Sequence, residues 1–370
     1  RDNFLKSFWN YSWFPRVNSV LLTICALRPE HLIVIPNIFC FGTVVALSDY
    51  IERLLFADVA KDSFNINLAP FVNSSKWDNQ KIIFIIPFLY GGYPTLIESF
   101  LAKADKNPNW IAVGDFSQCF FLDHHKLQWL TQFDVKLFSF GVSKHIDSGG
   151  SLAAFKCPCV FKEVSEYVTS RILTFKNRNH WSDQSKNEYK RDYYLGVSNG
   201  FDINFLKKYQ GLMLNGAHME SIQKVHDSYL FDRCVKKYLT ERSITILHTR
   251  SLHEYLRARL NHRVLFQPAD KLLNPWRVNF LFSEGGQLRD KLVHRIRERK
   301  LNASSWYPPI SKLLNIDVAK VNNLNDSIDF GLRIVNVWCD TDQNPLDLGD
   351  IYVSVIEDFY RTLPKIIHDL

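Results

Sequence analysis

Lys144 stands in the kind of segment that a Schiff-base lysine requires. It closes the run Ser139-Phe-Gly-Val-Ser-Lys144, just past an apolar stretch, and Gly149 and Gly150 follow shortly after it. An amine held near a strand end, desolvated or close to other cations, can condense with an aldehyde. The two glycines permit a tight turn beside a ligand. Taken by itself, the segment also matches an ordinary surface lysine in a turn.

A carboxylate closes a second apolar stretch. Asp115 begins the sequence Asp-Phe-Ser-Gln118 directly after the apolar residues 110–113. Beside a pyridine nitrogen, such a carboxylate keeps the nitrogen protonated and makes the ring a strong electron sink. Asp is also favoured as the N-cap of a helix, and the segment alone does not separate the two interpretations.

A third segment has donors for a phosphate. Arg16-Val-Asn18-Ser19 precedes the apolar run at residues 20–27, which predicts a helix that starts at Ser19. The N–H groups at a helix start bind phosphate, and Asn or Ser side chains add further donors. A plain N-cap is the simpler interpretation, and it is compatible with phosphate binding.

The elements that must position these residues alternate along the first half of the chain. Continuous apolar runs predict strands at residues 31–36, 53–59, 81–87, 110–115 and 135–140. Helices are predicted at residues 19–27, 43–51 and 95–103. Such runs separated by helices indicate an α/β architecture with a mostly parallel sheet buried on both faces. Ligands of such sheets lie at the carboxyl ends of the strands. Those ends carry Pro36-Asn37, Pro87 with Gly91-Gly92, Asp115 and Ser139.

The second half is less regular. The polar stretch at residues 176–192 is expected to be a surface excursion, and a helix over residues 218–239 is expected to link two parts of the chain. Beyond it, strands are predicted at residues 243–248, 263–267 and 278–282, and helices at residues 287–300 and 351–363. We therefore expect a large α/β domain over residues 1–239 and a smaller α+β domain over residues 240–370.

Charge and motif content exclude several classes of function. The chain has 370 residues and a formal net charge of +7, but its basic residues are dispersed. The densest group, at residues 289–300, alternates with apolar residues as in an amphipathic surface helix, so an anionic substrate is favoured over nucleic acid. His124-His125 is interpreted as a surface or helix-start pair. Ser143 and His145 flank Lys144 without forming a catalytic triad in the sequence, which argues against a hydrolase, and the chain has no Gly-x-Gly-x-x-Gly motif of a nicotinamide enzyme.

Cysteine usage and hydropathy favour a cytoplasmic protein. The seven cysteines are irregularly spaced, which suggests reduced, buried thiols. Cys157-Pro-Cys159 lacks the two-residue gap of a redox motif and a second ligand pair, so no metal site is expected. No apolar run is long enough for a membrane span, and the first residues do not have the form of a signal peptide.

The order and spacing of the three segments resemble the DegT/DnrJ/EryC1/StrS sugar aminotransferases, from about Trp13 to Leu363. The shared features are a Ser-containing first helix start, a strand that ends in Pro and aromatics (residues 33–41), an Asp-x-x-Gln motif and a Ser-Phe-x-x-x-Lys motif. Further likenesses are residues 274–277 (Asn-Pro-Trp-Arg), 303–309 and 335–340. The resemblance implies fold type I of the enzymes that depend on pyridoxal 5′-phosphate (PLP), which is the aspartate aminotransferase fold. It also implies a homodimer and transfer of an amino group, with glutamate as the expected donor, to a keto-sugar nucleotide in surface polysaccharide or related biosynthesis.

The resemblance also implies roles for single residues. Lys144 would form the Schiff base with PLP and move the proton, Asp115 would pair with the pyridine nitrogen, and Gln118 would contact the phenolic oxygen. Ser139, Asn18 and Ser19 would bind the phosphate, and a residue of Phe39–Phe41 would stack on the ring, with Cys40 at the aligned position. Trp306 and Tyr307 would contact the substrate.

Three departures from the family pattern leave alternatives open. The usual Ser-Gly-Thr phosphate loop is replaced by Pro15-Arg16-Val-Asn18-Ser19, in which Arg16 would pair with the phosphate directly. The family's histidine after the third strand is replaced around residues 88–92, and the partner-subunit motif is only echoed at residues 215–219. Two alternatives therefore stand beside a sugar aminotransferase: a non-catalytic interaction protein with the same fold, and a PLP enzyme acting on a non-sugar amino acid.

Overall fold

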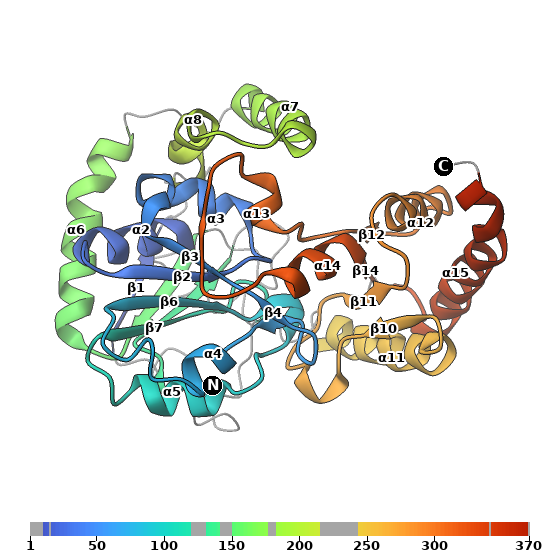
Figure 1. Cartoon of the computed structure of the whole chain (residues 1–370), viewed down its shortest axis with the longest axis horizontal. Helices are drawn as coiled ribbons and strands as arrows, with labels where there is room; N and C mark the ends of the chain where they lie inside the picture. The colour runs from blue at the N-terminus through green and yellow to red at the C-terminus, as the bar shows by residue number, and fades with distance from the viewer. Residues whose placement is uncertain are drawn as a thin grey trace.

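The computed structural model describes residues 10–14, 16–119, 131–140, 150–176, 183–214, 243–339 and 342–368. Its centre is an eight-stranded sheet of order β1-β9-β8-β7-β6-β2-β3-β13 (Figure 1). The strands from β8 to β13 in this order pair in parallel, whereas β9 is antiparallel to both β8 and β1. The bounds are β1 Asn10–Phe14, β2 Leu32–Pro36, β3 Leu54–Ala57, β6 Ile82–Pro87, β7 Trp110–Asp115, β8 Val135–Ser139, β9 Ser151–Phe155 and β13 Ala319–Lys320.

The five strands predicted from apolar runs are confirmed as β2, β3, β6, β7 and β8. Strand β6, with the sequence Ile-Ile-Phe-Ile-Ile-Pro, is buried at every position. Its side chains alternate between two hydrophobic cores: Ile83 and Ile85 belong to one, and Phe84 and Ile86 to the other. A strand that is covered on both faces needs apolar residues throughout, which is why the sequence shows a continuous run instead of an alternating pattern.

Helices cover both faces of this sheet. On one face lie α2 (Val17–Leu27), α3 (Phe41–Ala46), α6 (Pro158–Lys176) and α8 (Ile203–Leu214), whose apolar residues share a core with Ile33 and Ile35 of β2. On the other face lie α4 (Ala69–Val72) and α5 (Ile97–Ala104), which pack against Val34 and Phe84. The predicted helices at residues 19–27 and 95–103 correspond to α2 and α5. The one predicted at residues 43–51 is instead divided into α3 and the 3-10 helix η1 (Ser48–Arg53).

A second, antiparallel sheet lies beside the first, with order β10-β11-β14-β12 (Figure 1). Its strands are β10 (Val264–Phe266), β11 (Val278–Phe282), β14 (Ile334–Val337) and β12 (Ala303–Ser304), and three helices pack on it: α11 (Ser243–Leu260), α12 (Gln287–Glu298) and α15 (Pro345–His368). The strand and helix predictions from residue 263 onward are confirmed by β10, β11, α12 and α15.

One sequence prediction in the second half is wrong, and another needs refinement. Residues 243–248, expected to be a strand, form the first turns of α11, where Thr245, Thr249 and Leu252 are buried at helical spacing. In the polar stretch at residues 176–192, the residues whose exposure the structure describes lie at the surface as expected, but part of the stretch forms helix α7 (Asp183–Asn199), from which Tyr189 packs against the large core. The predicted linking helix at residues 218–239 and the domain boundary after residue 239 lie outside the described residues.

The chain returns to the large sheet after β12. Helix α13 (Ile310–Leu313) is held by the Ile310 N–H, which donates to the Asn37 carbonyl at 2.8 Å. Strand β13 then pairs with β3, and α14 (Asn325–Arg333) begins where the Ser327 N–H donates to Asp58 Oδ1 at 2.6 Å. This return path brings residues near position 306 to the carboxyl ends of the parallel strands.

The expectation of uniformly reduced cysteines is wrong for one pair. Cys157 and Cys159 form a disulfide at the start of α6. The two residues are two positions apart in the sequence, and their Cα atoms are 5.4 Å apart. Cys25, Cys40 and Cys119 are free thiols, and Cys25 and Cys119 are buried. Among the helices of the described residues, none combines the length and the hydropathy needed to cross a membrane.

Candidate active site at the strand ends

Asp115 ends β7 at the carboxyl edge of the large sheet. Its backbone is held on both sides, by register with Pro87 of β6 and with Leu137 of β8. The residue is 6% exposed, and its Oδ1 accepts a hydrogen bond from the Ser117 N–H at 2.9 Å. The side chain of Ser117 donates to the same oxygen. The carboxylate is therefore fixed in orientation at the place where parallel sheets bind ligands.

Gln118 joins Asp115's loop to two tyrosines. Its Oε1 accepts from the Tyr90 N–H at 3.0 Å, and its Nε2 donates to the Tyr307 hydroxyl at 2.8 Å. The Tyr90 hydroxyl donates to the Trp306 carbonyl at 2.9 Å and accepts from the Tyr307 N–H at 3.1 Å. Burial raises the pKa of both tyrosine hydroxyls, so both stay protonated donors at neutral pH. The hydrogen bonds to Trp306 and Tyr307 connect segments that lie 189 to 217 positions apart in the sequence.

The second sheet positions Trp306 and Tyr307 through a buried row of polar side chains. Asn279 Nδ2 donates to Gln267 Oε1 at 3.1 Å, and Asn336 Nδ2 donates to Asn279 Oδ1 at 3.0 Å. Asn336 Oδ1 in turn accepts from Ser304 Oγ at 2.8 Å and from the Trp306 N–H at 3.0 Å. This row crosses β10, β11, β14 and β12 and ends on the segment that carries Tyr307. Trp306 itself is 51% exposed.

At the start of α2, the Asn18 and Ser19 side chains form hydrogen bonds with other groups of the chain. Ser19 Oγ donates to the Arg16 carbonyl at 2.6 Å and accepts from the Arg16 N–H at 3.4 Å. Asn18 Nδ2 donates to the carbonyls of Gly42 and Met213, each at 3.3 Å, and its Oδ1 accepts from Thr43. Both side chains therefore connect α2 to itself and to α3 and α8. Burial lowers the pKa of Arg16, while the nearby Cys40 thiol acts in the opposite direction.

Two adjacent residues that were predicted as candidates to stack on a cofactor ring differ in their environment. Phe39 is 2% exposed and packs inside the large core. Cys40, the next residue, is half-buried at the start of α3 and lies close enough to Tyr307 and Arg16 to affect the pKa of each. Ser139 ends β8 opposite Ser151 of β9, one strand away from Asp115. The structure thus brings Arg16, Cys40, Gln118 and Tyr307 into one neighbourhood. Lys144 and His124-His125 lie outside the described residues.

Two residues of this neighbourhood were not singled out from the sequence. Tyr90 was seen only as part of the segment that replaces a family histidine, and Arg277 only as the end of the Asn-Pro-Trp-Arg run. A signal for Tyr90 was present in Gly91, which has φ +76° and whose missing Cβ makes room for the backbone of Asn274. Glycine at such a position permits the close approach of another chain segment. Which segment approaches cannot be inferred from the sequence, because Asn274 is far away along the chain.

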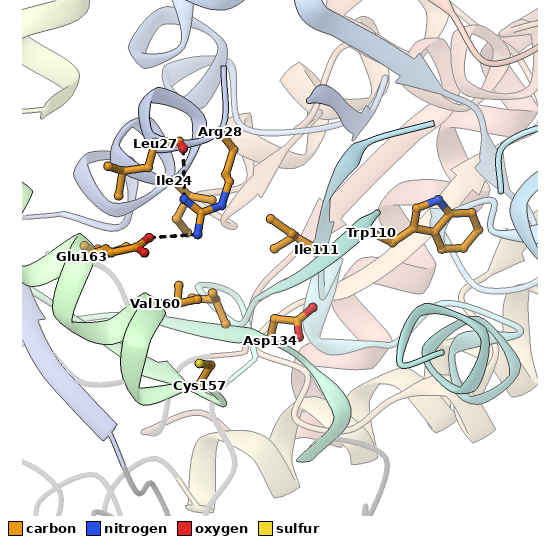
Figure 2. Close-up of a pocket in the computed structure, with 11 residues that line it drawn as sticks. Ile24, Leu27, Arg28, Trp110, Ile111, Asp134, Cys157, Val160 and Glu163 are labelled. Atoms are coloured by element: carbon orange, nitrogen blue, oxygen red, sulfur yellow. Dashed lines mark hydrogen bonds and ion pairs between the residues drawn. The ribbon is translucent and has the colours of Figure 1, made fainter. Parts of the chain in front are cut away.

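A separate small pocket lies at the opposite, amino end of the strands. It has a volume of about 110 Å³ and is lined mainly by apolar side chains of α2, β7 and α6, among them Ile24, Ile111 and Val160 (Figure 2). An ion pair between Arg28 and Glu163, at 2.9 Å, lies at its edge. Burial raises the pKa of Asp134 there, whose Oδ2 accepts from the Ala112 N–H at 2.8 Å. The pocket has none of the predicted site residues.

Comparison with known proteins gives matches in structure only. No protein-family model matches the sequence, and no curated protein matches it. An aminotransferase described as DegT DnrJ EryC1 StrS, from Brucella abortus, superimposes with a TM-score of 0.65 at 13% identity, over 95% of this chain and 86% of that one.

Two further structures match at similar levels. DesI, solved in the presence of its TDP-sugar product, has a TM-score of 0.66 at 12% identity, over 98% of this chain and 84% of that one. The GDP-4-keto-6-deoxy-D-mannose-3-dehydratase of E. coli, with bound hydrated PLP, has a TM-score of 0.60 at 14% identity, over 95% and 89%. The chain therefore has the α/β fold of the DegT/DnrJ/EryC1/StrS aminotransferases, the fold type I of PLP enzymes, over nearly its whole described length.

Proposed function

We propose that this protein is a PLP-dependent aminotransferase that moves an amino group from an amino acid, with glutamate as the expected donor, to a keto group of a nucleotide-linked sugar. The observation that carries the proposal is the buried Asp115 carboxylate at the end of β7, next to a Gln118 side chain fixed by Tyr90 and Tyr307. The fold adds support, because one of the matching structures holds PLP and another was solved with its sugar-nucleotide product.

The residues at the strand ends fit PLP. When bound, PLP would supply an electron sink for the substrate carbon that loses or gains a proton. Asp115 would hold a proton on the pyridine nitrogen, a task that suits a carboxylate kept in place by Ser117. Gln118 would face the phenolic oxygen, and Lys144 would carry protons to and from the substrate carbon. Ser139 would contact the phosphate.

The phosphate contact at α2 is the least usual part. The side chains of Asn18 and Ser19 already form hydrogen bonds within the protein. The first turn of a helix nevertheless leaves backbone N–H groups without acceptors inside the helix. We propose that these N–H groups and the Arg16 guanidinium hold the phosphate, with Asn18 and Ser19 fixing the geometry of the turn.

Cofactor binding is tested with the full-length chain and the variant Lys144→Ala. After PLP is added and unbound PLP removed, we expect a visible absorption band in the parent protein, loss of that band on borohydride treatment, and its absence from the variant. Mass spectrometry of the reduced protein should then find the cofactor on the peptide that contains Lys144. No band in the parent at saturating PLP would reject the proposal.

Substrate class is tested separately. The PLP-loaded protein is incubated with glutamate and a panel of keto-sugar nucleotides, and we expect amination of at least one of them. If PLP binds but no member of the panel is aminated while non-sugar amino acids react, the substrate class would be wrong although the cofactor assignment holds.

One observation favours a second candidate, a non-catalytic interaction protein of the same fold. The side chains of Asn18 and Ser19 are engaged inside the chain, so the loop that differs from the family pattern also offers fewer donors to a phosphate. Absence of PLP binding together with a stable fold would favour this candidate.

Three finer assignments rest on the sequence, two of them on the resemblance and the cytoplasmic location on cysteine usage and hydropathy. We propose a homodimer, a cytoplasmic location and a role in surface polysaccharide or related biosynthesis. Light scattering of the purified protein checks the first: a mass of about twice 43.2 kDa is expected, and a monomer at micromolar concentration would contradict it.

A further inference from the structure

Arg277 places a cation beside the candidate site. It directly precedes β11, and Trp338 directly follows β14, in the register that pairs Val278 with Val337. The guanidinium carbon lies 4.3 Å from the centroid of the Trp276 ring and 4.2 Å from that of the Trp338 ring. Contacts with indole rings hold an arginine through cation–π attraction and stacking, but they do not neutralise it.

The charge of Arg277 is only partly compensated. Its Nε is buried and has no hydrogen-bond partner, and no ion pair joins Arg277 to any acid in the part of the chain that the structure describes. Burial lowers the pKa of the guanidinium, and the groups that act in the opposite direction are the hydroxyls of Tyr307 and Tyr90. A partly buried cation without an anion is less favourable than one that a ligand neutralises.

The same two tyrosines connect Arg277 to the candidate site. Tyr307 accepts from Gln118, and the Tyr90 hydroxyl is bonded to the backbone of Trp306 and Tyr307. An anion on Arg277 would therefore lie next to the residues proposed to bind PLP. The Asp115 charge also reaches Tyr307, so the group of interacting side chains extends from Arg277 to the end of β7.

We propose that Arg277 is a substrate-binding residue that takes a two-oxygen anion at the edge of the site, and that this anion is the carboxylate of the amino-acid donor or of its oxo-acid product. The planar guanidinium presents N–H groups in the geometry that a carboxylate accepts with both oxygens. This assignment rests on the proposed function for the identity of the acid, because an aminotransferase must bind an amino acid and release an oxo acid. Phosphate has related geometry, so the phosphate groups of a nucleotide sugar are the other source of such an anion.

Nearby cations make the choice of probe important. Trp338 also lines a surface hollow with Arg297 and Lys300, which are exposed on or just after α12. A phosphate ligand would be attracted by that whole region, whereas a single carboxylate needs the guanidinium of Arg277. Glutarate and inorganic pyrophosphate are therefore suitable separate probes, and neither undergoes transamination.

The test uses titration calorimetry of the full-length chain with glutarate and, separately, with pyrophosphate. The variants are Arg277→Gln, Arg277→Lys and the control Arg295→Gln, which removes the same charge from an exposed position on α12. Loss of a charged hydrogen-bonding pair is expected to weaken glutarate binding by roughly 10- to 100-fold in Arg277→Gln. Arg277→Lys should recover only part of the affinity, because lysine lacks the fork of donors, and Arg295→Gln should bind like the parent.

Two outcomes would overturn the proposal. Parent-like glutarate binding by Arg277→Gln, or no glutarate binding by the parent, would remove Arg277 as a carboxylate-binding residue. A loss confined to pyrophosphate would assign the arginine to the phosphate of a nucleotide and equally reject the carboxylate. Thermal melting of each variant shows whether it is folded. If Arg277→Gln does not fold, the loss of glutarate affinity is measured in Arg277→Lys instead. Because binding is measured without turnover, Arg277-dependent glutarate binding in a protein that fails to bind PLP would refute the proposed function alone.

Discussion

At the scale of single residues, Asp115 offers the most direct test of the proposed chemistry. Asp115→Asn keeps the shape of the side chain but removes the negative charge that would hold a proton on the pyridine nitrogen. We expect the turnover number for amino transfer to fall by about 100-fold, in the range typical of losing one acid–base group. PLP should still bind to Lys144, because the phosphate contacts are unchanged.

Steady-state kinetics and the absorption band of bound PLP together check this prediction. Ser117→Ala is the matched control, since it removes one donor to Asp115 Oδ1 but leaves the Ser117 N–H bond and the carboxylate in place. Its turnover should change by only a few fold. Full activity of Asp115→Asn would show that the carboxylate is merely a loop-capping group.

The residue types at strand ends predicted part of the candidate site, but not the hydrogen bonds that join it to the second sheet. Asp115 and Gln118 stood out because they follow a buried apolar run, and the structure places both at the carboxyl edge of the sheet. The hydrogen bonds from Gln118 to Tyr307 and from Tyr90 to Trp306 span 189 and 216 positions. Such pairs depend on how the two sheets meet, and no local pattern in the sequence encodes that.

At the scale of elements, apolar periodicity predicted the parallel strands because burial on both faces leaves little choice of residue. The same reasoning was wrong at residues 243–248, where a short mixed run was interpreted as a strand. Its continuation buries Leu252, Leu256 and Leu260 at helical spacing, which shows that α11 is specified over 18 residues and not over six. The strand β13 has only two residues, so the sequence shows no periodic pattern that predicts it. Its pairing with β3 depends on where the neighbouring segments place it.

The buried polar row in the second sheet yields a prediction at this scale. Asn336→Ala would leave Asn279 Oδ1, Ser304 Oγ and the Trp306 N–H without their partner. Unsatisfied buried polar groups cost about 1–3 kcal/mol each, with relaxation reducing their sum, so we expect the free energy of unfolding to decrease by about 2–3 kcal/mol. We also expect weaker PLP binding, because Tyr307 would be less well positioned.

Denaturant titration measures the first effect, and PLP titration of the folded variant measures the second. The control is Asn322→Ala, which changes an exposed asparagine and should alter stability by less than about 0.5 kcal/mol. If Asn336→Ala lost stability but kept the PLP affinity of the parent, the row would support the second sheet without positioning the site.

At the scale of the whole molecule, the two sheets meet where the chain returns from β12 to α13, α14 and β13. Asn37 receives the Ile310 and Ser311 N–H groups, and Asp58 receives that of Ser327, so the residues directly after β2 and β3 determine where the returning segment lies. Tyr307 is inside this segment, between the polar row of the second sheet and the loops of the first. The geometry of the candidate site therefore depends on both sheets being folded and joined.

Global stability should also respond to pH through His253 on α11. The imidazole is 2% exposed, and its Nε2 lies 2.9 Å from the Gln267 carbonyl. Burial lowers the pKa of His253, with Arg257 acting in the same direction and the Gln267 bond and Glu254 opposing it. In the unfolded chain the pKa returns to about 6.5. As the pH falls below that value, the unfolded state binds the proton first, so stability decreases until the pH passes the lower folded pKa.

Each unit by which the folded pKa is depressed contributes about 1.4 kcal/mol to this loss. His253→Gln removes the titration, so its free energy of unfolding should change less between pH 7.5 and pH 5 than that of the parent. Comparing each protein with itself at the two pH values separates this effect from any constant cost of the substitution. The control His294→Gln changes an exposed histidine and should keep the parent's pH dependence. If the free energy of unfolding decreased equally from pH 7.5 to pH 5 in the parent and in His253→Gln, the pH dependence would belong to other groups. One such group is His31, whose pKa is also lowered by burial.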